Sequence, residues 1–268
     1  MVFIEDMIVS VSVFEKVLAA AKSKLPGSLL NSLVAKSNPD DTAVILFTSG
    51  SEKAPKAVEL SHKNLLSNID TALEAFPFKH EDRMLAILPY FHIFGHMANL
   101  WLPIKLGMRV IVYANPLDFK TIVRIIREEQ ATLVFGTPFF LMGYLKQAKQ
   151  GDFESITAMV ASADKLPATL RDSFQEKHGI EVLEAYGTTE TSPVISANLP
   201  GANKPGSIGR VLPNIQVRIT DIDTGKDLPA GAEGKILVKG DLVMKGYLDD
   251  LQETALKVKD GWYETGDM

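Results

Sequence analysis

Short apolar runs alternate with amphipathic segments between residues 84 and 184, and this alternation allows few folds. The apolar runs predict β-strands, and the segments with apolar residues at helical spacing predict helices. The pattern therefore predicts an α/β fold, with a mainly parallel sheet covered by helices on both faces. In such sheets, ligands collect at the carboxyl ends of the strands. The expected strands are Met84–Leu88, Arg109–Val112, Leu133–Phe135, Met159–Ala161 and Val182–Glu184, and the expected helices are Phe94–Leu106, Phe119–Gln130, Pro138–Lys149 and Pro167–His178.

The segment before this region also carries strand and helix patterns. Alternating apolar residues predict a strand at Thr42–Phe47 and a short strand at Val58–Leu60. Ser61 is a suitable N-cap for a helix that ends near Ala75. The remaining predictions are an edge strand within residues 1–12 and a helix over Val13–Lys24.

The sequence changes in character near residue 198. Glycine and proline punctuate residues 198–205, and the alternating segments Ile215–Thr220 and Lys235–Lys239 predict strands beyond them. We therefore expect an α/β core over residues 1–197 and a small β-rich subdomain over residues 198–268. The last residues form neither a terminating helix nor a polar tail, so we expect the chain to be a piece of a longer protein, cut between domains.

The composition narrows the classes of partner. The 268 residues are 46% hydrophobic and 23% charged, which is typical of a globular protein with a sizeable core. A net charge of −5 without a basic block argues against nucleic acid or an anionic membrane as a partner. No apolar run approaches the length of a membrane span, and the start lacks a basic secretory signal. The absence of cysteine excludes disulfides, thiolate zinc sites and a cysteine nucleophile on this chain, and it suits a cytoplasmic protein.

The loop that follows the strand at Thr42–Phe47 has the composition of a phosphate-binding loop. Its sequence from Thr48 to Lys56 is TSGSEKAPK. The hydroxyl groups are hydrogen-bond donors, Gly50 lets backbone N–H groups approach an anion closely, and Lys56 supplies a positive charge. These properties make the loop the first candidate for a functional site.

Three interpretations of this loop are open. A Walker A loop requires Gly-x-x-x-x-Gly-Lys followed by Ser or Thr, but counting from Gly50 the second glycine position is Pro55 and the residue after Lys56 is Ala57. A phosphotransferase of the Walker type is therefore disfavoured. The loop is closer to the pattern Thr-Ser-Gly-Ser/Thr-Thr/Glu-Gly-x-Pro-Lys-Gly of adenylate-forming enzymes. A Ser/Gly-rich surface turn without a ligand is the third interpretation.

Two later motifs carry groups that suit a nucleotide. Residues 184–190 have the sequence EAYGTTE, in which the ring of Tyr186 can stack on a base, the threonines can donate to a phosphate and Glu190 can hold Mg²⁺. Residues 260–267 have the sequence DGWYETGD, in which the last carboxylate can accept both hydroxyl groups of a ribose. The alternatives are a polar loop with a packed tyrosine and a hairpin turn.

The three motifs occur in an order that resembles a known family. From the phosphate loop to its end, the chain resembles the large N-terminal domain of adenylate-forming, or acyl-activating, enzymes. The segments FTSGSE at 47–52, LPYFHIFG at 88–95 and SADKL at 162–166 resemble most closely the acyl–acyl carrier protein synthetase part of bacterial bifunctional 2-acylglycerophosphoethanolamine acyltransferases. The resemblance implies that residues 1–197 are part of an adenylation core and that the family's C-terminal lid domain is absent from this chain.

The resemblance also implies a reaction. ATP and Mg²⁺ would be the cofactors, and a long-chain fatty acid would be joined to the α-phosphate with release of pyrophosphate. The acyl group would then pass to the phosphopantetheine thiol of acyl carrier protein, or to coenzyme A in an acyl-CoA ligase; a degenerate nucleotide-binding module without turnover is a further alternative. The whole protein would be cytoplasmic, at the cytoplasmic face of the bacterial inner membrane. This chain alone is expected to fold but not to turn over, because the family's bridging lysine lies on the lid domain.

The family's residue roles map onto matching positions of this sequence. Tyr186 would stack on adenine, Asp267 would bind the ribose, and Glu190 with Thr48 would hold the metal. The residues expected to act in catalysis are Thr48, Lys56, His92, Thr189 and Glu190. The other expected nucleotide contacts are Ser49, Gly50, Ser51, Ser162, Ala163, Asp164, Glu184, Ala185, Gly187 and Thr188.

Some positions depart from the family pattern or have a plainer explanation. Lys53 and Ala57 stand where the family pattern has glycines. If either has positive φ, its side chain strains the loop by about 1 kcal/mol and weakens nucleotide binding. His92 is expected beside the acid's carboxylate, with a buried structural histidine as the alternative. The candidates for an acyl tunnel, with plain core as the alternative, are Met97, Phe140 and Met142.

Overall fold

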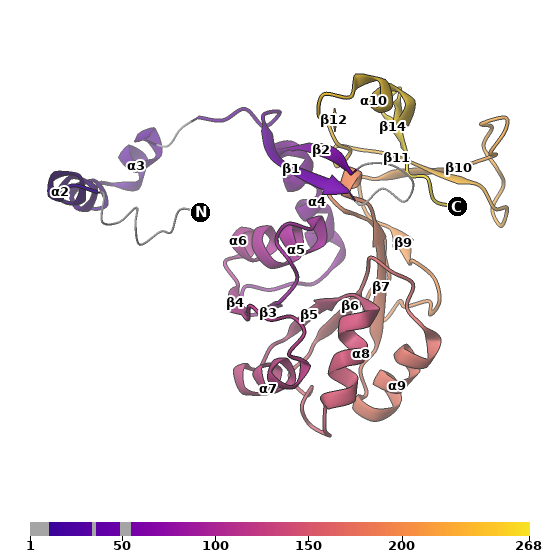
Figure 1. Ribbon diagram of the computed structural model, residues 1–268, viewed down its shortest axis with the longest axis horizontal. Helices are drawn as coiled ribbons and strands as arrows, with labels where there is room; N and C mark the ends of the chain where they lie inside the picture. The colour runs from indigo at the N-terminus through magenta and orange to yellow at the C-terminus, as the bar shows by residue number, and fades with distance from the viewer. Residues whose placement is uncertain (1–10, 34–35, 49–54) are drawn as a thin grey trace. The chain divides into compact units, whose positions relative to one another are not determined.

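A computed structural model describes residues 11–33, 36–48 and 55–268 (Figure 1). The chain divides into two compact units, Met1–Asn38 and Pro39–Met268. Helices α2 (Val13–Lys22) and α3 (Gly27–Leu33) belong to the first unit. Helix α2 begins after a capping box, because Ser12 accepts from the backbone N–H of Glu15 and the Glu15 carboxylate accepts from that of Ser12. The edge strand expected within residues 1–12 falls mostly outside the described residues.

A seven-stranded sheet is the centre of the second unit. Its strand order is β4-β3-β5-β6-β7-β8-β9, with parallel pairing from β4 to β7 and antiparallel pairing of β8 and β9. The α/β fold with a mainly parallel sheet is therefore confirmed. The strands are β3 (Arg83–Ala86), β4 (Arg109–Val112), β5 (Leu133–Gly136), β6 (Ala158–Ala161), β7 (Val182–Gly187), β8 (Val194–Ala197) and β9 (Arg210–Val211).

Helices cover this sheet on both faces. Helices α7, α8 and α9 lie together on one side of the sheet in Figure 1, and α5 and α6 lie on the other. The helix bounds are α4 (His62–Ala75), α5 (Ile93–His96), α6 (Leu102–Leu106), α7 (Phe119–Glu129), α8 (Pro138–Gln147) and α9 (Ala168–His178).

The single helix expected over Phe94–Leu106 is interrupted. A π-helical turn, Met97–Trp101, separates α5 from α6. Pro103 has no backbone N–H and cannot donate to the carbonyl of Asn99, so the regular hydrogen-bond ladder is broken at this point. Turns of this type are frequent at functional sites.

Two smaller sheets complete the second unit. One has the order β1-β2-β12 and consists of β1 (Thr42–Thr48), β2 (Lys56–Ser61) and β12 (Gly246–Tyr247). The other has the order β10-β11-β14-β13 and consists of β10 (Gln216–Thr220), β11 (Lys235–Lys239), β13 (Val258–Lys259) and β14 (Trp262–Glu264), with α10 (Leu251–Lys257) beside it. Because β12 pairs with β2, a segment from the C-terminal end of the chain lies beside the strand that follows the phosphate loop. The expected boundary at residue 198 stays a prediction.

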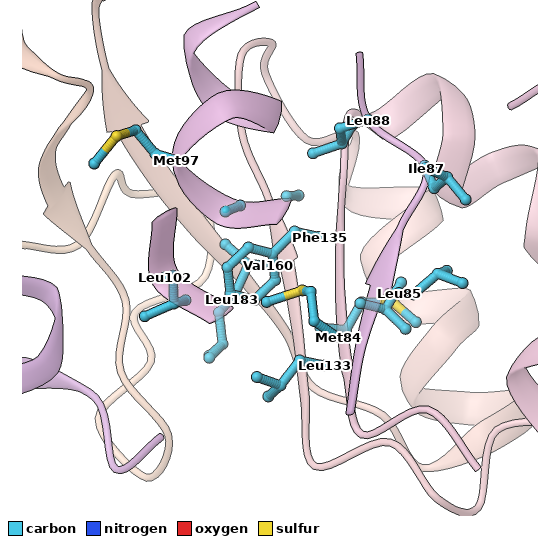
Figure 2. Close-up of a cluster of buried hydrophobic side chains, with 14 of the residues drawn as sticks. Met84, Leu85, Ile87, Leu88, Met97, Leu102, Leu133, Phe135, Val160 and Leu183 are labelled. Carbon is cyan, nitrogen blue, oxygen red and sulfur yellow. The ribbon is translucent and has the colours of Figure 1, made fainter. Parts of the chain in front are cut away.

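Apolar side chains fill the space between the central sheet and its helices. Figure 2 shows Met84 and Leu85 of β3 with Leu133 and Phe135 of β5, packed among residues of neighbouring strands and helices. Their burial follows from the apolar strand runs in the sequence. Among the described residues, no helix has both the length and the apolar character needed to cross a membrane.

Candidate functional site

A cavity of about 250 Å³ lies at the carboxyl ends of β5, β6 and β7. Its walls come from these strand ends, from α4 and from the α5 to α6 region. Most of the wall is apolar, and the polar groups gather where β7 ends. The lining residues are Asn68, Ile69, Ala72, Phe76, Phe78, His92, Ile93, Phe94, Met97, Ala98, Leu102, Phe135, Val160, Ser162, Ala163, Ala185, Tyr186, Gly187, Thr188, Thr189, Pro193, Val194 and Ala197.

The cavity collects many of the residues expected from the sequence. The predicted residues among its lining are His92, Ser162, Ala163, Ala185, Tyr186, Gly187, Thr188 and Thr189. Met97, a candidate for the acyl tunnel, also lines it, whereas Phe140 and Met142 do not. Ser49, Gly50, Ser51 and Lys53 lie outside the described residues. The cavity therefore joins an apolar chamber to one end of the predicted nucleotide site.

The loop from Thr188 to Val194 is held in shape by tight local contacts. Thr188 and Thr191 cap the short 3-10 helix η2 (Thr189–Thr191). A Cβ on Gly187 would lie 1.9 Å from the carbonyl oxygen of Pro193, so only glycine allows the backbone to pass there. These contacts give the hydroxyl groups of Thr188 and Thr189 a defined place at the cavity.

Helix α4 also holds the loop from Thr188 to Val194 through a buried side chain. The Asn68 side chain, 2% exposed, donates to the carbonyl oxygen of Val194 at 2.8 Å and to that of Thr191 at 3.3 Å. It also accepts from the backbone N–H of Val194 at 3.3 Å. One turn earlier, Asn64 donates to the carbonyl oxygens of Asp241 at 2.7 Å and Val243 at 2.8 Å. Asn68 therefore binds the loop that contains Glu190 to α4, and Asn64 binds the segment just before Met244 to the same helix.

Glu190 is nearly buried, at 8% exposure. Its Oε1 accepts a hydrogen bond of 2.9 Å from the Tyr247 hydroxyl, and its backbone carbonyl accepts one of 2.8 Å from the N–H of Met244. Burial, followed by the negative charge of Glu190, raises the pKa of Tyr247 above its ordinary value. Tyr247 is therefore a protonated donor to Glu190 at neutral pH.

Lys56 is placed close to the same tyrosine. Its ammonium forms an ion pair with Glu253 of α10 and lies 4.9 Å from the centroid of the Tyr247 ring. Thr48 pairs with Lys56 across β1 and β2, so the two ends of the phosphate loop adjoin. Ala57 lies inside β2 opposite Phe47 and is not among the residues with positive φ. The condition under which the side chain of Ala57 would strain the loop, a positive φ, is therefore not met.

Tyr186 and Asp267 are brought together by the meeting of β7 with the chain's last residues. The Tyr186 hydroxyl donates to Asp267 Oδ2 at 2.6 Å, although the two residues were expected to contact different parts of a nucleotide. Burial, followed by this hydrogen bond, raises the pKa of Tyr186. The carbonyl of Asp267 accepts from the N–H of Ile236, which fixes the segment against β11. The ring and the carboxylate therefore lie within one nucleoside-sized region.

The remaining predicted nucleotide contacts have backbone partners. Ser162 donates to the carbonyl of Ala185 at 2.8 Å, and Glu184 accepts from the N–H of Gly206 at 3.0 Å. Asp164 accepts from the N–H of Lys165 at 2.7 Å. Ala163 has φ of 69°, which is uncommon for a residue with a side chain and is concentrated at functional sites. Of these, Asp164 and Glu184 do not line the cavity.

His92 is the N-cap of α5. Its Nδ1 accepts from the backbone N–H of Phe94 at 3.2 Å, so in the neutral ring the proton is on Nε2. Burial lowers the pKa of His92 below its ordinary value. The residue therefore brings a neutral N–H donor to the cavity wall, and its capping bond shows that it also has a structural role.

Tyr247, Glu253 and Asn68 were not predicted from the sequence. Tyr247 stands in a Gly-Tyr pair that has no strand pattern, and Glu253 resembles any exposed charge on a short helix. Asn68 interrupts the apolar side of α4, where it is buried. This interruption was the one signal in the sequence that could have indicated a role for Asn68.

The donor set around Glu190 suits Mg²⁺ bound together with phosphates. In residues 11–33, 36–48 and 55–268, no group of three or more histidine, cysteine or acidic side chains could form a metal cage. Mg²⁺ keeps several waters and commonly takes one or two carboxylates plus substrate phosphates. One carboxylate, with the neighbouring threonine hydroxyls, fits that chemistry.

Comparison with known proteins gives consistent matches. A family model described as AMP-binding enzyme matches residues 5–248. A long-chain-fatty-acid CoA ligase of Bacillus subtilis (strain 168) is 36% identical over 241 residues, which cover 88% of this chain and 43% of that protein. A 4-coumarate CoA ligase of Pinus taeda is 30% identical over 246 residues, which cover 87% of this chain and 46% of that protein.

A solved structure agrees with these matches. The ATP-bound MatB from Rhodopseudomonas palustris superposes with a TM-score of 0.80 at 31% identity, covering 87% of this chain and 46% of that chain. The chain thus spans a little under half the length of the relatives it matches.

Proposed function

The chain belongs to the family of AMP-binding enzymes, and on that premise we propose that it carries the nucleotide and acid sites of an enzyme that activates fatty acids with ATP. The observation that carries this proposal is the apolar cavity, whose polar end is formed by Gly187, Thr188 and Thr189. An alkyl chain gains about 0.8 kcal/mol for each methylene buried in such a cavity. A fatty acid held there would direct its carboxylate toward the predicted phosphate contacts.

The proposed first step forms an acyl-adenylate. A carboxylate oxygen attacks the α-phosphorus of ATP, the bond to the bridging oxygen of the β-phosphate breaks, and pyrophosphate leaves. Both reactants are anions, so catalysis depends on alignment and charge neutralisation rather than on proton transfer. Thr188 and Thr189 donate to phosphate oxygens, Lys56 supplies positive charge, and the Nε2–H of His92 donates to the acid's carboxylate. Mg²⁺, held by Glu190, would neutralise further phosphate charge.

The proposed second step transfers the acyl group to a thiol, which releases AMP. Coenzyme A is the favoured acceptor, because the relatives at 36% and 30% identity are named as CoA ligases. Acyl carrier protein stays a second candidate on the resemblance of residues 88–95 and 162–166 to a carrier-protein synthetase. Both acceptors present the same phosphopantetheine thiol, so the chemistry of the site does not distinguish them.

Identification of the nucleotide products tests the proposal. The full-length protein that contains this chain is used, because the chain alone is expected to fold without turnover. It is incubated with ATP, Mg²⁺ and fatty acids of increasing length, with 4-coumarate as an aromatic competitor, and the second step is assayed with coenzyme A and with acyl carrier protein separately. We expect acid-dependent formation of pyrophosphate and AMP, with fatty acids preferred over the aromatic acid. ADP as the product, or nucleotide cleavage that does not depend on an acid, would contradict the proposal.

Glu190→Gln is the informative variant in this assay. Glutamine can still accept from Tyr247, so folding is preserved, whereas a carboxylate ligand is lost. We expect adenylation to lose several kcal/mol of transition-state stabilisation, which is the order found for removal of a metal ligand. Glu176→Gln, at an exposed glutamate of α9, is the matched control and should leave the rate unchanged. A normal adenylation rate for Glu190→Gln would show that Glu190 does not bind the metal ion.

A further inference from the structure

We propose that Tyr247 is a positioning residue that holds Lys56 and Glu190 in one arrangement for the phosphates of the nucleotide. The inference rests on the proposed function, which places these two side chains at the triphosphate and its metal. The inference adds Tyr247, which lies outside the three sequence motifs. It explains how the segments that carry Lys56 and Glu190 keep a fixed position relative to each other.

The first contact is made by the hydroxyl group. It donates to Glu190 Oε1 at 2.9 Å in a buried setting, and this bond restricts rotation of the carboxylate. Hydrogen bonds to a metal-binding carboxylate orient the ligand and raise metal affinity. The second carboxylate oxygen of Glu190 has no part in this bond and can face a metal ion.

The second contact is made by the aromatic ring. The Lys56 ammonium lies 4.9 Å from the ring centroid while it is paired with Glu253. The side chains of Lys56 and Glu253 are 25% and 18% exposed, so the pair is partly shielded from water. The ring quadrupole attracts a cation over its face, so we expect this contact to persist when the phosphates replace the carboxylate partner of Lys56.

The backbone of Tyr247 is fixed from both sides. Tyr247 pairs with Val58 of β2, and Leu248 donates to the carbonyl of Ala57 at 2.8 Å. The N–H of Tyr247 donates to Thr254 Oγ1 of α10 at 2.8 Å. The residue is thus tied to the strand that carries Lys56 and to the helix that carries Glu253. A shift of either element would be transmitted to the ring and, through the hydroxyl, to Glu190.

Glu253 has a defined place in this arrangement. It neutralises Lys56 in the nucleotide-free protein, and an incoming triphosphate must displace it to reach the ammonium. Glu253 therefore competes with the β- and γ-phosphates, whereas AMP, which lacks them, does not meet this competition. Tyr247 keeps Lys56 in place during the exchange.

Tyr247→Phe tests the proposal, because it removes the hydroxyl and keeps the ring. Binding of ATP is measured by calorimetry over a series of Mg²⁺ concentrations, with thermal denaturation as the check on folding. We expect the Mg²⁺ concentration for half-maximal binding to rise about 10- to 100-fold, the range found when the hydrogen-bond partner of a metal ligand is removed. ATP binding without Mg²⁺ should be unchanged.

Tyr113→Phe is the matched control. Its hydroxyl also donates to a carboxylate, Asp118, at 2.9 Å, but Tyr113 follows β4 at the edge of the central sheet and does not line the cavity. In a Glu190→Gln background, Tyr247→Phe should add nothing to the loss of Mg²⁺ dependence, since the hydroxyl acts through Glu190. A Mg²⁺ dependence of Tyr247→Phe equal to that of the wild-type protein, together with a defective Glu190→Gln, would overturn this inference and leave the proposed function standing. Absence of Mg²⁺-dependent ATP binding in the wild-type protein would overturn both.

Glu253→Gln provides a second test, which leaves the buried hydrogen bond between Tyr247 and Glu190 intact. Because a partly exposed ion pair contributes up to about 1 kcal/mol, freeing Lys56 should tighten ATP binding about two- to fivefold at low salt. AMP binding should not change. Unchanged or weaker ATP binding by this variant would show that Lys56 is not shared between Glu253 and the phosphates, and would overturn the part of the inference that concerns Glu253.

Discussion

At His92, the local hydrogen bonds determine which ring nitrogen carries the proton. Nδ1 accepts from the N–H of Phe94, and burial lowers the pKa of His92, so the folded protein holds a neutral ring with Nε2–H. The pKa in the unfolded chain is about 6.5. Below that pH the unfolded state binds more protons than the folded state, and stability falls as the pH is lowered toward the depressed folded pKa.

This dependence gives a prediction for His92→Asn. Asparagine caps a helix well and does not titrate, so the variant should lose part of the decrease in melting temperature between pH 7.5 and pH 5. His96 and His178 also have lowered pKa values, so the rest of the pH dependence of stability should remain in the variant. The check is thermal unfolding of both proteins across this range. Superimposable profiles would show that His92 contributes no pH dependence.

Ala57 provides a prediction that reverses the expectation from the sequence. The family pattern has glycine there, but Ala57 is inside strand β2 with an ordinary backbone conformation. Ala57→Gly should therefore destabilise the protein by about 0.5–1 kcal/mol, through the extra freedom of glycine in the unfolded chain. Denaturant unfolding measures the change. An increase in stability would show that the site is strained after all.

The residue scale also shows what the sequence can reveal about a site. Tyr186, Thr188, Thr189 and Glu190 lie in one contiguous motif, so their proximity was predictable. Tyr247 was not, because its role depends on pairing between β2 and β12, which are far apart in the chain. Such a contact leaves no local pattern in the residues around it.

At the scale of elements, α4 connects the site to the core. Asn68 makes three hydrogen bonds to the backbone of Thr191 and Val194, all from a buried position. Asn68→Ala should cost about 1–3 kcal/mol of stability, because these backbone groups lose their partner. It should also weaken nucleotide binding, since Thr189 and Glu190 lie in the released loop.

The neighbouring variant Ser67→Ala is the control for this prediction. Ser67 is on the same helix and donates only to the carbonyl of Asn64. Chemical denaturation and ATP titration are measured for both variants. If Asn68→Ala lowered stability but left ATP binding untouched, α4 would have a role in folding and none in shaping the loop.

The regular elements were predictable and the irregular ones were not. The five parallel strands have continuous apolar runs, and helices α7 to α9 have helical periodicity. Their observed bounds differ from the expected ones by at most two residues, except that β7 ends three residues later than expected. Strands β9, β12 and β13 have two residues each, which is too short for any periodicity. The π-helical turn was not predicted, because a proline within an apolar run does not by itself show whether the helix ends, kinks or changes its hydrogen-bond pattern.

On the scale of the whole molecule, the fold and family followed from the order of motifs, but the cavity required the structure. Its wall combines residues from α4, from α5 to α6, and from the ends of three strands. Apolar residues such as Met97 and Phe140 look alike in the sequence, yet only the first lines the cavity. Which apolar residues are core and which are wall depends on packing between elements, which no single segment encodes.

The central claim is that the cavity and the predicted nucleotide contacts form one site for an acyl-adenylate. Calorimetric titration with a hydrolysis-resistant fatty acyl-adenylate analogue, compared with AMP, tests it most directly. At about 0.8 kcal/mol per buried methylene, three or four methylenes in the cavity make the analogue bind about 100-fold more tightly than AMP. Ala72→Phe, which adds a ring at a half-buried wall position, should remove most of this difference and leave AMP binding unchanged. Equal affinities for the analogue and AMP in the wild-type protein would contradict the account.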